Sequence, residues 1–259
     1  MWFDSHNHLQ DARLGSSTPL ITAMRAAEVA ACVVNATSED DWEVVSELAQ
    51  AESGWALPAF GIHPWKANLA LPGWLDRLKD RLEKTPLASI GECGLDQWIA
   101  TPNLKIQKPI FEAQLRLACE MERPLTIHCL KAWGALFEAF ATAPPPSRFL
   151  MHSFNGSIEI AQRLIPLGAY FSFSGYFLHE RKAAMLEVFK KLPLDKILLE
   201  TDAPDMLPPA AFIRHPINAG LNHPANLAAI GEALAVDLKI PVEELAQITR
   251  DNTRRCFGF

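Results

Sequence analysis

The sequence predicts an α/β protein, a (β/α)8 TIM barrel that forms a single domain over residues 1–259. Two observations favour this fold. Eight short apolar runs of strand character alternate with longer stretches of helical periodicity, in a chain of the usual barrel length. The alternative, a doubly wound open sheet, would place a glycine-rich phosphate loop after its first strand, and SHNHLQD at 5–11 is not such a loop.

The expected strands are short runs rich in aliphatic and aromatic residues. They cover 2–5, 31–35, 56–61, 87–91, 125–128, 148–152, 169–174 and 196–200. The proline-rich patch at 143–147 is too short to link two domains, and it indicates a loop before the sixth strand.

Helices are expected between these strands. Ser38 is a candidate N-cap, because the acidic residues 39–41 that follow it would favour the positive end of a helix dipole. Gly168 stands where a helix is expected to stop. The other expected helices cover 73–84, 110–122, 132–141, 157–167, 180–191, 224–237 and 241–253.

Composition limits the class of protein. A hydrophobic content of 49% and a charged content of 21% are ordinary for a soluble protein with a sizeable core. We expect no membrane association, because no apolar run approaches the ~18 residues of a membrane span and no signal peptide is evident. Five cysteines without a CxxC motif favour the reducing cytoplasm. Nothing in the pattern demands more than a monomer.

The net charge of −6 counts mildly against a protein that coats nucleic acid through a basic surface. It does not exclude an enzyme whose metal ions supply positive charge locally. The overall charge therefore leaves the substrate class open.

Side chains that can bind a metal gather at the carboxyl ends of the expected strands. His6 and His8 follow the first strand and are separated by one residue, so they share a face of an extended chain. This pair alone is equally well explained as two hydrogen-bonded histidines. The later strands are followed or ended by His63, Glu92, His128, His152 and Asp202. Because barrel active sites lie at this end of the strands, these side chains together predict one site.

The donor types of this site predict its metals. Nitrogen and oxygen donors without thiolate suit Zn²⁺, Mn²⁺ or Mg²⁺ and disfavour a closed structural zinc site. The six candidate ligands are His6, His8, Glu92, His128, His152 and Asp202. Six exceed the needs of one tetrahedral ion, so we expect two divalent ions ~3.5–4 Å apart, with Glu92 as the bridge. Such a pair activates water for attack on a phosphoryl or carbonyl group.

Seven motifs, in this order and spacing, resemble the TatD-type metal-dependent deoxyribonucleases of the amidohydrolase-like barrel superfamily. They are DSHNH, GIHP, GECGLD, RPLTIHC, MHSFNGS, LLETDAP and NHPAN, and the match extends from about residue 2 to the final TRDNTRRCFGF. The resemblance implies hydrolysis of phosphodiester bonds in DNA, commonly described for the family as exonucleolytic.

The resemblance also implies residue roles. The first ion would be held by His6, His8, Glu92 and Asp202, and the second by Glu92, His128 and His152. His63 would face a phosphate or support the ligands from outside. Asp202 would position, and deprotonate, the attacking water.

The sequence departs from the family pattern at positions expected to touch substrate. Where the family often has arginine two residues after His128, this chain has Leu130, followed by Lys131. Lys131 is a candidate phosphate contact that acts as a point charge. After GLD the chain has Gln97 and Trp98, where the family commonly has an aromatic residue or histidine. The metal chemistry is thus better supported than the preference for DNA.

Other residues have competing interpretations. Trp65 and Trp98 lie near the expected rim and either stack on a base or form an aromatic lid. Arg214 is a candidate substrate contact, because it falls in the long irregular stretch 203–224. His223, also in this stretch, stands where the family commonly has glutamate.

Two further groups are expected to have structural roles only. Cys93 and Cys129 neighbour proposed ligands along their strands, and side chains of strand neighbours point to opposite faces. Both are therefore expected to be buried packing residues. The basic cluster Arg181, Lys182, Lys190 and Lys191 is expected to be an exposed helix face.

Two alternative functions remain. One is a hydrolase of amides, lactones or phosphotriesters on the same barrel. Many such sites bridge their metals with a carboxylated lysine on the fourth strand, and Glu92 at that position favours the nuclease instead. The other is an inactive barrel that binds a partner. Loss of function would remove ligands first, and all six are present.

Overall fold

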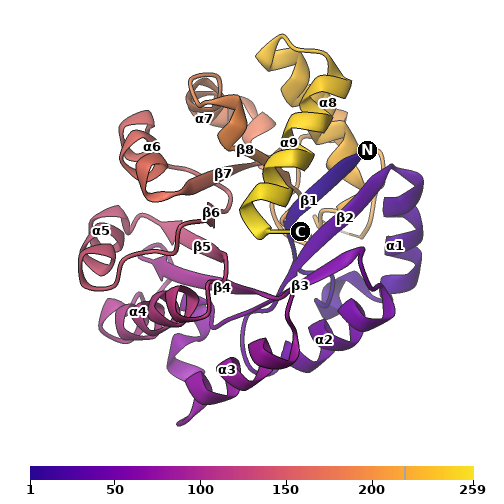
Figure 1. The fold of residues 1–259 in the computed structure, drawn as a ribbon. Helices are drawn as coiled ribbons and strands as arrows, with labels where there is room; N and C mark the ends of the chain where they lie inside the picture. The colour runs from indigo at the N-terminus through magenta and orange to yellow at the C-terminus, as the bar shows by residue number, and fades with distance from the viewer. Residues whose placement is uncertain (219) are drawn as a thin grey trace.

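The computed structural model describes residues 1–218 and 220–259, and it confirms the predicted (β/α)8 barrel. Eight parallel strands follow one another in chain order around one sheet, at the centre of the view in Figure 1. The strands are β1 (Trp2–Asn7), β2 (Val29–Asn35), β3 (Ala56–Phe60), β4 (Ser89–Asp96), β5 (Leu125–Leu130), β6 (Phe149–Met151), β7 (Ala169–Ser174) and β8 (Ile197–Glu200).

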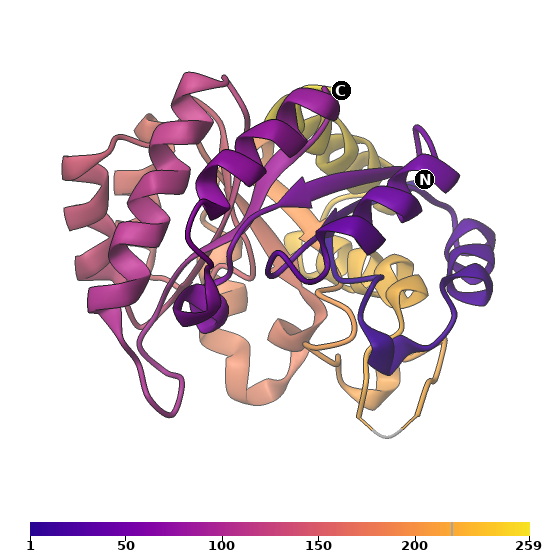
Figure 2. The same ribbon diagram turned by 90° about the horizontal axis from the view of Figure 1, so that it is seen from below.

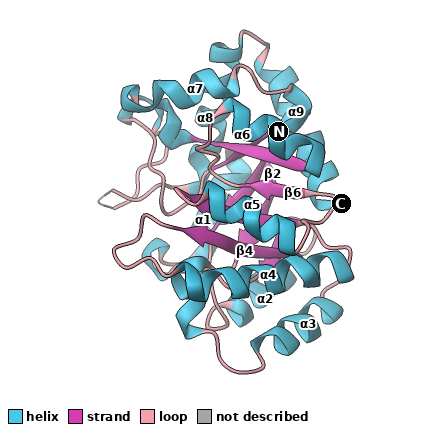
Figure 3. Ribbon diagram, turned by 90° about the vertical axis from the view of Figure 1, so that its left-hand side faces the viewer, coloured by secondary structure: helices cyan, strands magenta, loops and turns pink. Residues whose placement is uncertain are grey.

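Helices surround the strands on the outside (Figures 1 and 3). They are α1 (Ser17–Ala26), α2 (Trp42–Ala51), α3 (Trp74–Lys84), α4 (Leu104–Glu120), α5 (Trp133–Thr142), α6 (Ile158–Leu164), α7 (Ala183–Phe189), α8 (Leu227–Leu238) and α9 (Val242–Phe257). Short 3-10 turns include η2 (Pro64–Leu69), η4 (Gly175–Leu178), η5 (Glu180–Lys182) and η8 (Pro224–Asn226). No helix among the described residues has the length and apolar character needed to cross a lipid bilayer.

Hydrogen bonds between the ends of β1 and β8 join the first strand to the last. The backbone N–H of Asp202 donates to the carbonyl oxygen of His6 at 3.0 Å, and that of His8 donates to Ala203 at 2.8 Å. The join therefore brings Asp202 beside the opening histidine pair, although some 200 residues separate them in the chain.

Several element boundaries differ from the sequence expectation. The predicted strand 87–91 is observed as Ser89–Asp96, so Glu92 lies within β4 rather than after it. Helix α2 starts at Trp42, which makes Ser38 the wrong N-cap. The Asp41 carboxylate instead accepts the backbone N–H groups of residues 37 and 38, and this turn delays the helix.

Helix α1 was not expected, although its sequence carries a helical signal. Its buried residues Leu20, Ile21 and Met24 recur at helical spacing. The segment is short and begins with serine, threonine and proline, which favour turns as strongly as helix starts. By contrast, Gly168 ends its helix in the left-handed conformation, as predicted.

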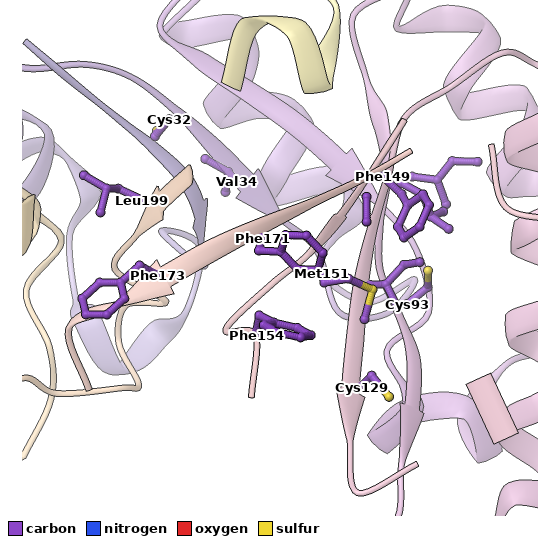
Figure 4. Packing of buried hydrophobic residues seen from close by; sticks show 14 of the residues in the cluster. Cys32, Val34, Cys93, Cys129, Phe149, Met151, Phe154, Phe171, Phe173 and Leu199 are labelled. Atoms are coloured by element: carbon purple, nitrogen blue, oxygen red, sulfur yellow. The ribbon is translucent and has the colours of Figure 1, made fainter. Parts of the chain in front are cut away.

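The apolar core has two parts. The larger part lies between strands and helices, where Phe154 and Phe171 pack with ring centroids 4.6 Å apart (Figure 4). Cys93 and Cys129 are buried in this part, which confirms their packing role. The smaller part consists of Val33, Leu57, Ala59, Leu150, Tyr170, Leu198, Cys256 and Phe257.

Strand alternation leads from this smaller cluster to polar residues at the other end of the barrel. His152 follows β6 directly, two residues beyond Leu150, and Glu200 ends β8, two residues beyond Leu198. Side chains two apart on a strand face the same way, so the polar groups point to the barrel axis above the apolar residues. The loops after the strands, including the orange segment after β8, lie away from the chain termini (Figure 2).

Candidate metal centre

The histidines at the end of β1 converge on one point. The Nε2 atoms of His6 and His8 lie 3.2 Å apart, as expected for alternate residues of a strand. The Nδ1 atom of His8 lies 2.7 Å from the carbonyl oxygen of Asn35. A neutral ring that donates Nδ1–H to this oxygen keeps the lone pair of Nε2 free for a cation.

Two carboxylates complete this first group of donor atoms. Glu92 Oε2 lies 3.3 Å from the Nε2 atoms of both His6 and His8. Asp202 Oδ1 lies 3.3 Å from His6 Nε2 and 3.5 Å from His8 Nε2. Ligand atoms bound tetrahedrally at the usual 2.0–2.2 Å are about 3.3–3.6 Å from one another. The separations of 3.2–3.5 Å are close to this range, and the ligand atoms of His6, His8 and Glu92 lie near enough to one another to share one ion.

The other oxygen of Glu92 faces a second group. Glu92 Oε1 lies 2.8 Å from His152 Nε2, 3.1 Å from His128 Nδ1 and 3.1 Å from His63 Nε2. The His128 and His152 nitrogens are 3.1 Å apart. The structure therefore brings all six predicted ligands and His63 together, with one Glu92 oxygen toward each group.

A buried atom without a hydrogen bond supports a cation at this position. Glu92 is only 2% exposed, and its Oε1 atom has no hydrogen-bond partner among the described residues despite the nearby imidazoles. A buried carboxylate oxygen without a partner costs free energy. A divalent ion bound by Oε1 would remove this cost, so the residues present fit a metal.

A bulge in β4 points Glu92 into the barrel mouth. The pairing of β4 with β5 shifts register between Ile90 and Cys93, and the Glu92 N–H donates to Ala36 at the end of β2 instead. Bulges commonly redirect side chains next to active sites. Gly91 permits this bend, since a Cβ atom there would lie 2.8 Å from the side chain of Thr126.

The electrostatic environment keeps both carboxylates ionised. Burial alone would raise the pKa of Glu92, but the surrounding histidines, His152 first, hold it well below its usual range. Asp202 behaves in the same way, with its pKa lowered by hydrogen bonds from His6 and His8 against the effect of burial. Ionised carboxylates are the form that binds divalent cations.

The nearby carboxylates change the pKa values of the imidazoles. Burial alone would lower the pKa values of His8, His128 and His152, but contacts with the carboxylates raise all three. A bound cation would therefore compete with protons for the nitrogen atoms of these rings. His63 differs, because burial outweighs its contact with Glu92 and lowers its pKa to about 4.

Asp96 is a candidate functional residue that was not predicted from the sequence. Its Oδ2 atom lies 2.9 Å from His128 Nε2 and accepts the indole N–H of Trp65 at 2.7 Å. Its Oδ1 atom accepts the backbone N–H of Trp98 at 2.6 Å. Asp96 thus orients one candidate ligand and holds two rim aromatics. It is the last residue of GECGLD, and an acid that ends a strand was the available signal.

Replacing Asp96 by asparagine is expected to weaken metal binding about 10- to 100-fold, the usual effect of losing the carboxylate behind a ligating histidine. Nδ1 of His128 faces Glu92 because Nε2–H donates to Asp96. Titration of the metal-free protein with Mn²⁺ measures the change. A dissociation constant within twofold of the parent would exclude this orienting role.

Buried acids form a further layer beneath the candidate ligands. Glu200 accepts hydrogen bonds from the hydroxyl groups of Ser153 and Ser172. Asp4 accepts the hydroxyl of Thr201 at 2.6 Å, and burial raises the pKa of Asp4 to about 7. This layer was not predicted from the sequence either.

Two of the predicted substrate contacts, Lys131 and Trp65, lie beside the candidate ligands. Lys131 lines a cavity beside His128 and His152. Trp65 contacts the site edge, with its ring 6.3 Å from that of His128.

Arg214 is not brought to this cavity. Its guanidinium instead pairs with Glu232 on α8, 2.8 Å from Nη1 to Oε1. His223 caps η8 by accepting the N–H of Ala225 at 3.0 Å. The exposed-face interpretation is wrong for Lys182, which lies in η5, is half-buried and also lines the cavity.

Comparison with known proteins gives one consistent relationship. The family described as TatD related DNase matches residues 3–258. The "Uncharacterized metal-dependent hydrolase YjjV" of Escherichia coli K12 is 31% identical over 262 residues, which cover 99% of this chain and 98% of the relative. The "3'-5' ssDNA/RNA exonuclease TatD" of Pantoea ananatis is 29% identical over 248 residues, 92% of each chain.

Solved structures with the same fold include a TatD homologue. The crystal structure of YJJV, a TatD homologue from Escherichia coli K12, superposes with a TM-score of 0.89 at 28% identity and covers 100% of this chain and 98% of that one. The organophosphorus hydrolase from Deinococcus radiodurans has a TM-score of 0.66 at 18% identity, covering 99% of this chain and 92% of that one. At that identity, the second likeness concerns the fold alone.

Proposed function

The chain belongs to the family of TatD related DNases, and we propose that it is a hydrolase of phosphodiester bonds in nucleic acid that uses two divalent metal ions. One observation carries the proposal. Glu92 Oε2 faces the nitrogens of His6 and His8, while Oε1 faces those of His128 and His152. A carboxylate placed between two sets of donors is suited to bridge two cations.

We assign the first ion to His6, His8, Glu92 and Asp202, and the second to Glu92, His128 and His152. Each ion is Mg²⁺, Mn²⁺ or Zn²⁺, because these cations suit oxygen and nitrogen donors. When bound, the ions supply Lewis-acid polarisation of the phosphoryl group and lower the pKa of a coordinated water.

Asp202 is the proposed proton acceptor. Its carboxylate is ionised, with a lowered pKa, and lies at the edge of the first donor group with 9% of the residue exposed. The ionised carboxylate can accept a hydrogen bond from an attacking water molecule and so orient it, and it is the proposed acceptor of that water's proton.

His63 is proposed to contact the phosphate rather than to bind an ion. Its Nδ1 atom accepts the backbone N–H of Trp65 at 3.1 Å, so in the neutral ring Nε2 carries the proton. The pKa of about 4 keeps the ring neutral at physiological pH. Nε2–H can then donate to a phosphate oxygen, whereas a metal ligand would need a lone pair there.

Nucleic acid is the proposed substrate because of family membership and because the Pantoea ananatis relative is named an exonuclease of single-stranded DNA and RNA. The cavity beside the candidate ligands carries Lys131 and Lys182. These ammonium groups provide local positive charge in a protein of net charge −6.

A labelled single-stranded oligonucleotide tests the proposal. We expect the protein to release nucleotides with Mg²⁺, Mn²⁺ or Zn²⁺, and EDTA to abolish the release. The same preparation is offered panels of lactones, amides and phosphotriesters. Turnover confined to those panels, with no cleavage of oligonucleotides, would contradict the proposed function.

We further propose that residues 1–259 act as a single domain and as a monomer, since every candidate ligand comes from this one chain. Cytoplasmic location is proposed because all five cysteines are free.

A further inference from the structure

We infer that Gln107 and Gln114 of α4 are positioning residues, whose side-chain amides take the place of a strand neighbour between β3 and β4 and so fix Asp96 and His63 at the candidate metal centre. The part that concerns Asp96 is independent of the reaction. The part that concerns His63 rests on the proposed function, because there His63 contacts the phosphate.

The starting observation is that α4 buries two polar side chains on one face. Gln107 and Gln114 are 2% and 0% exposed, although glutamine is mostly found at protein surfaces. They are seven residues apart on α4, which lies on the outside of the barrel (Figure 1), so they share one face of the helix. A buried amide costs free energy unless it is hydrogen-bonded. The partners of these two amides therefore show what the helix holds in place.

The hydrogen bonds between β3 and β4 end before the two strands reach the candidate ligands. The last residues paired across these strands are Phe60 and Ile90. Beyond them the Glu92 N–H donates to the end of β2 instead. Buried backbone groups need partners, so the groups of Ile62 and Asp96 that lie farther along the two strands must find them elsewhere.

Gln107 pairs with both backbone groups of Asp96. Its Oε1 atom accepts the Asp96 N–H at 2.8 Å, and its Nε2 atom donates to the Asp96 carbonyl oxygen at 3.1 Å. The next residue, Gln97, donates its N–H to Leu130 on β5, so the backbone groups of Asp96 face away from β5. The amide thus supplies the two hydrogen bonds that a neighbouring strand would make, and it fixes the backbone from which Asp96 reaches His128.

Gln114 pairs in the same way with Ile62. Its Oε1 atom accepts the Ile62 N–H at 2.8 Å, and its Nε2 atom donates to the Ile62 carbonyl oxygen at 3.2 Å. The next residue, His63, donates its N–H at 2.8 Å to Thr37, which follows β2. Gly61 permits the close approach, because a Cβ atom there would lie 2.9 Å from Gln114 Oε1. The backbone of His63 is thus held from both sides of its strand.

These two pairings control side chains that touch the candidate ligands. The Asp96 carboxylate holds His128 Nε2, and His63 Nε2 lies 3.1 Å from Glu92 Oε1. Removal of either amide would leave a buried N–H and a buried carbonyl without partners, which is costly. The strand end would then shift to find new partners, and its side chain would move with it. A lost apolar contact of the same helix creates no such demand.

A titration of the metal-free protein with Mn²⁺ tests the role of Gln107. Gln107→Met, which has a similar length but no amide, is expected to weaken Mn²⁺ binding about 10-fold, by misplacing the carboxylate behind His128. The double variant Gln107→Met/Asp96→Asn should bind Mn²⁺ within about twofold of Asp96→Asn alone, because the glutamine acts through that carboxylate. Leu117→Ala, which removes a buried apolar contact from the same helix, is the matched control. It should lower the melting temperature and keep parental Mn²⁺ affinity.

Inorganic phosphate, titrated into the protein saturated with Mn²⁺, tests the role of Gln114. Gln114→Met is expected to weaken phosphate binding about 10-fold, the usual effect of losing a hydrogen bond to a charged group. Its Mn²⁺ affinity should stay within about twofold of the parent, and the loss should not add to that of His63→Gln. If a methionine variant does not fold, the asparagine variant at the same position replaces it, with the same expected result, because its shorter amide cannot reach both backbone groups.

The outcomes separate this inference from the proposed reaction. If oligonucleotides are not cleaved but Gln107→Met weakens Mn²⁺ binding without adding to Asp96→Asn, the positioning role stands and the proposed reaction fails. Parental Mn²⁺ affinity in Gln107→Met, or a loss that adds fully to that of Asp96→Asn, would overturn the role of Gln107. Parental phosphate affinity in Gln114→Met, or a parent that binds no phosphate, would overturn the role of Gln114.

Discussion

Replacing Glu92 by glutamine is expected to reduce turnover by roughly 10³-fold or more while the barrel still folds. Glutamine has nearly the same shape but only one oxygen and no charge, so it cannot serve both donor groups. The observed distances of 2.8–3.3 Å from the two Glu92 oxygens to imidazoles on both sides show how much depends on this side chain. Steady-state kinetics with a labelled oligonucleotide measures the loss.

Glu120→Gln is the matched control for this variant. Glu120 ends α4 on the outer surface, where its carboxylate pairs with Lys79. We expect parental activity in Glu120→Gln and parental circular dichroism spectra in both variants. Activity of Glu92→Gln within tenfold of the parent would remove Glu92 from the mechanism.

Replacing Asp202 by asparagine is expected to lower kcat by at least about 10²-fold, because the amide cannot accept a proton from water at neutral pH. Asp202 also contributes a donor atom 3.3–3.5 Å from the nitrogens of His6 and His8, and some loss of metal affinity should accompany the loss of rate. Saturating Mn²⁺ separates the two effects, since added metal restores occupancy but not proton transfer.

The control for this prediction is Asp237→Asn, on α8, where the carboxylate lies 3.9 Å from Lys190 at the surface. It should retain parental kcat and metal affinity. Full recovery of Asp202→Asn by excess Mn²⁺ would show that Asp202 only holds the ion.

The candidate ligands could be predicted because their placement depends on strand register. His6 and His8 share a face through the two-residue period of β1, and their rings do converge. The carboxyl ends of parallel strands meet at one mouth of a barrel, which placed His128 and His152 near them without knowledge of the packing.

Strand register does not predict that the two oxygens of Glu92 face different groups of histidines. That arrangement depends on a bulge after Ile90 and on a hydrogen bond to Ala36, and neither follows from strand periodicity. Asp96 was missed because its partners, Trp65 and His128, lie about 30 residues away on each side. Such contacts require the assembled sheet.

The substrate contacts could not be predicted reliably for the same reason, because they depend on residues that are distant in the sequence. Arg214 lies in a long loop and carries a charge. In the folded chain its guanidinium pairs with Glu232 on α8, 18 positions later. Lys182 belongs to a run of basic residues, and only the folded chain shows that it lines the cavity. Charge along a sequence does not reveal which charges are already neutralised.

Elemental analysis of the purified protein tests the shared use of Glu92 most directly. After removal of loose metal by dialysis, the parent and Glu120→Gln are expected to contain about two divalent ions per chain, and Glu92→Gln clearly fewer. A parent protein that holds one ion or none after exposure to Mg²⁺, Mn²⁺ and Zn²⁺ would contradict the two-ion centre.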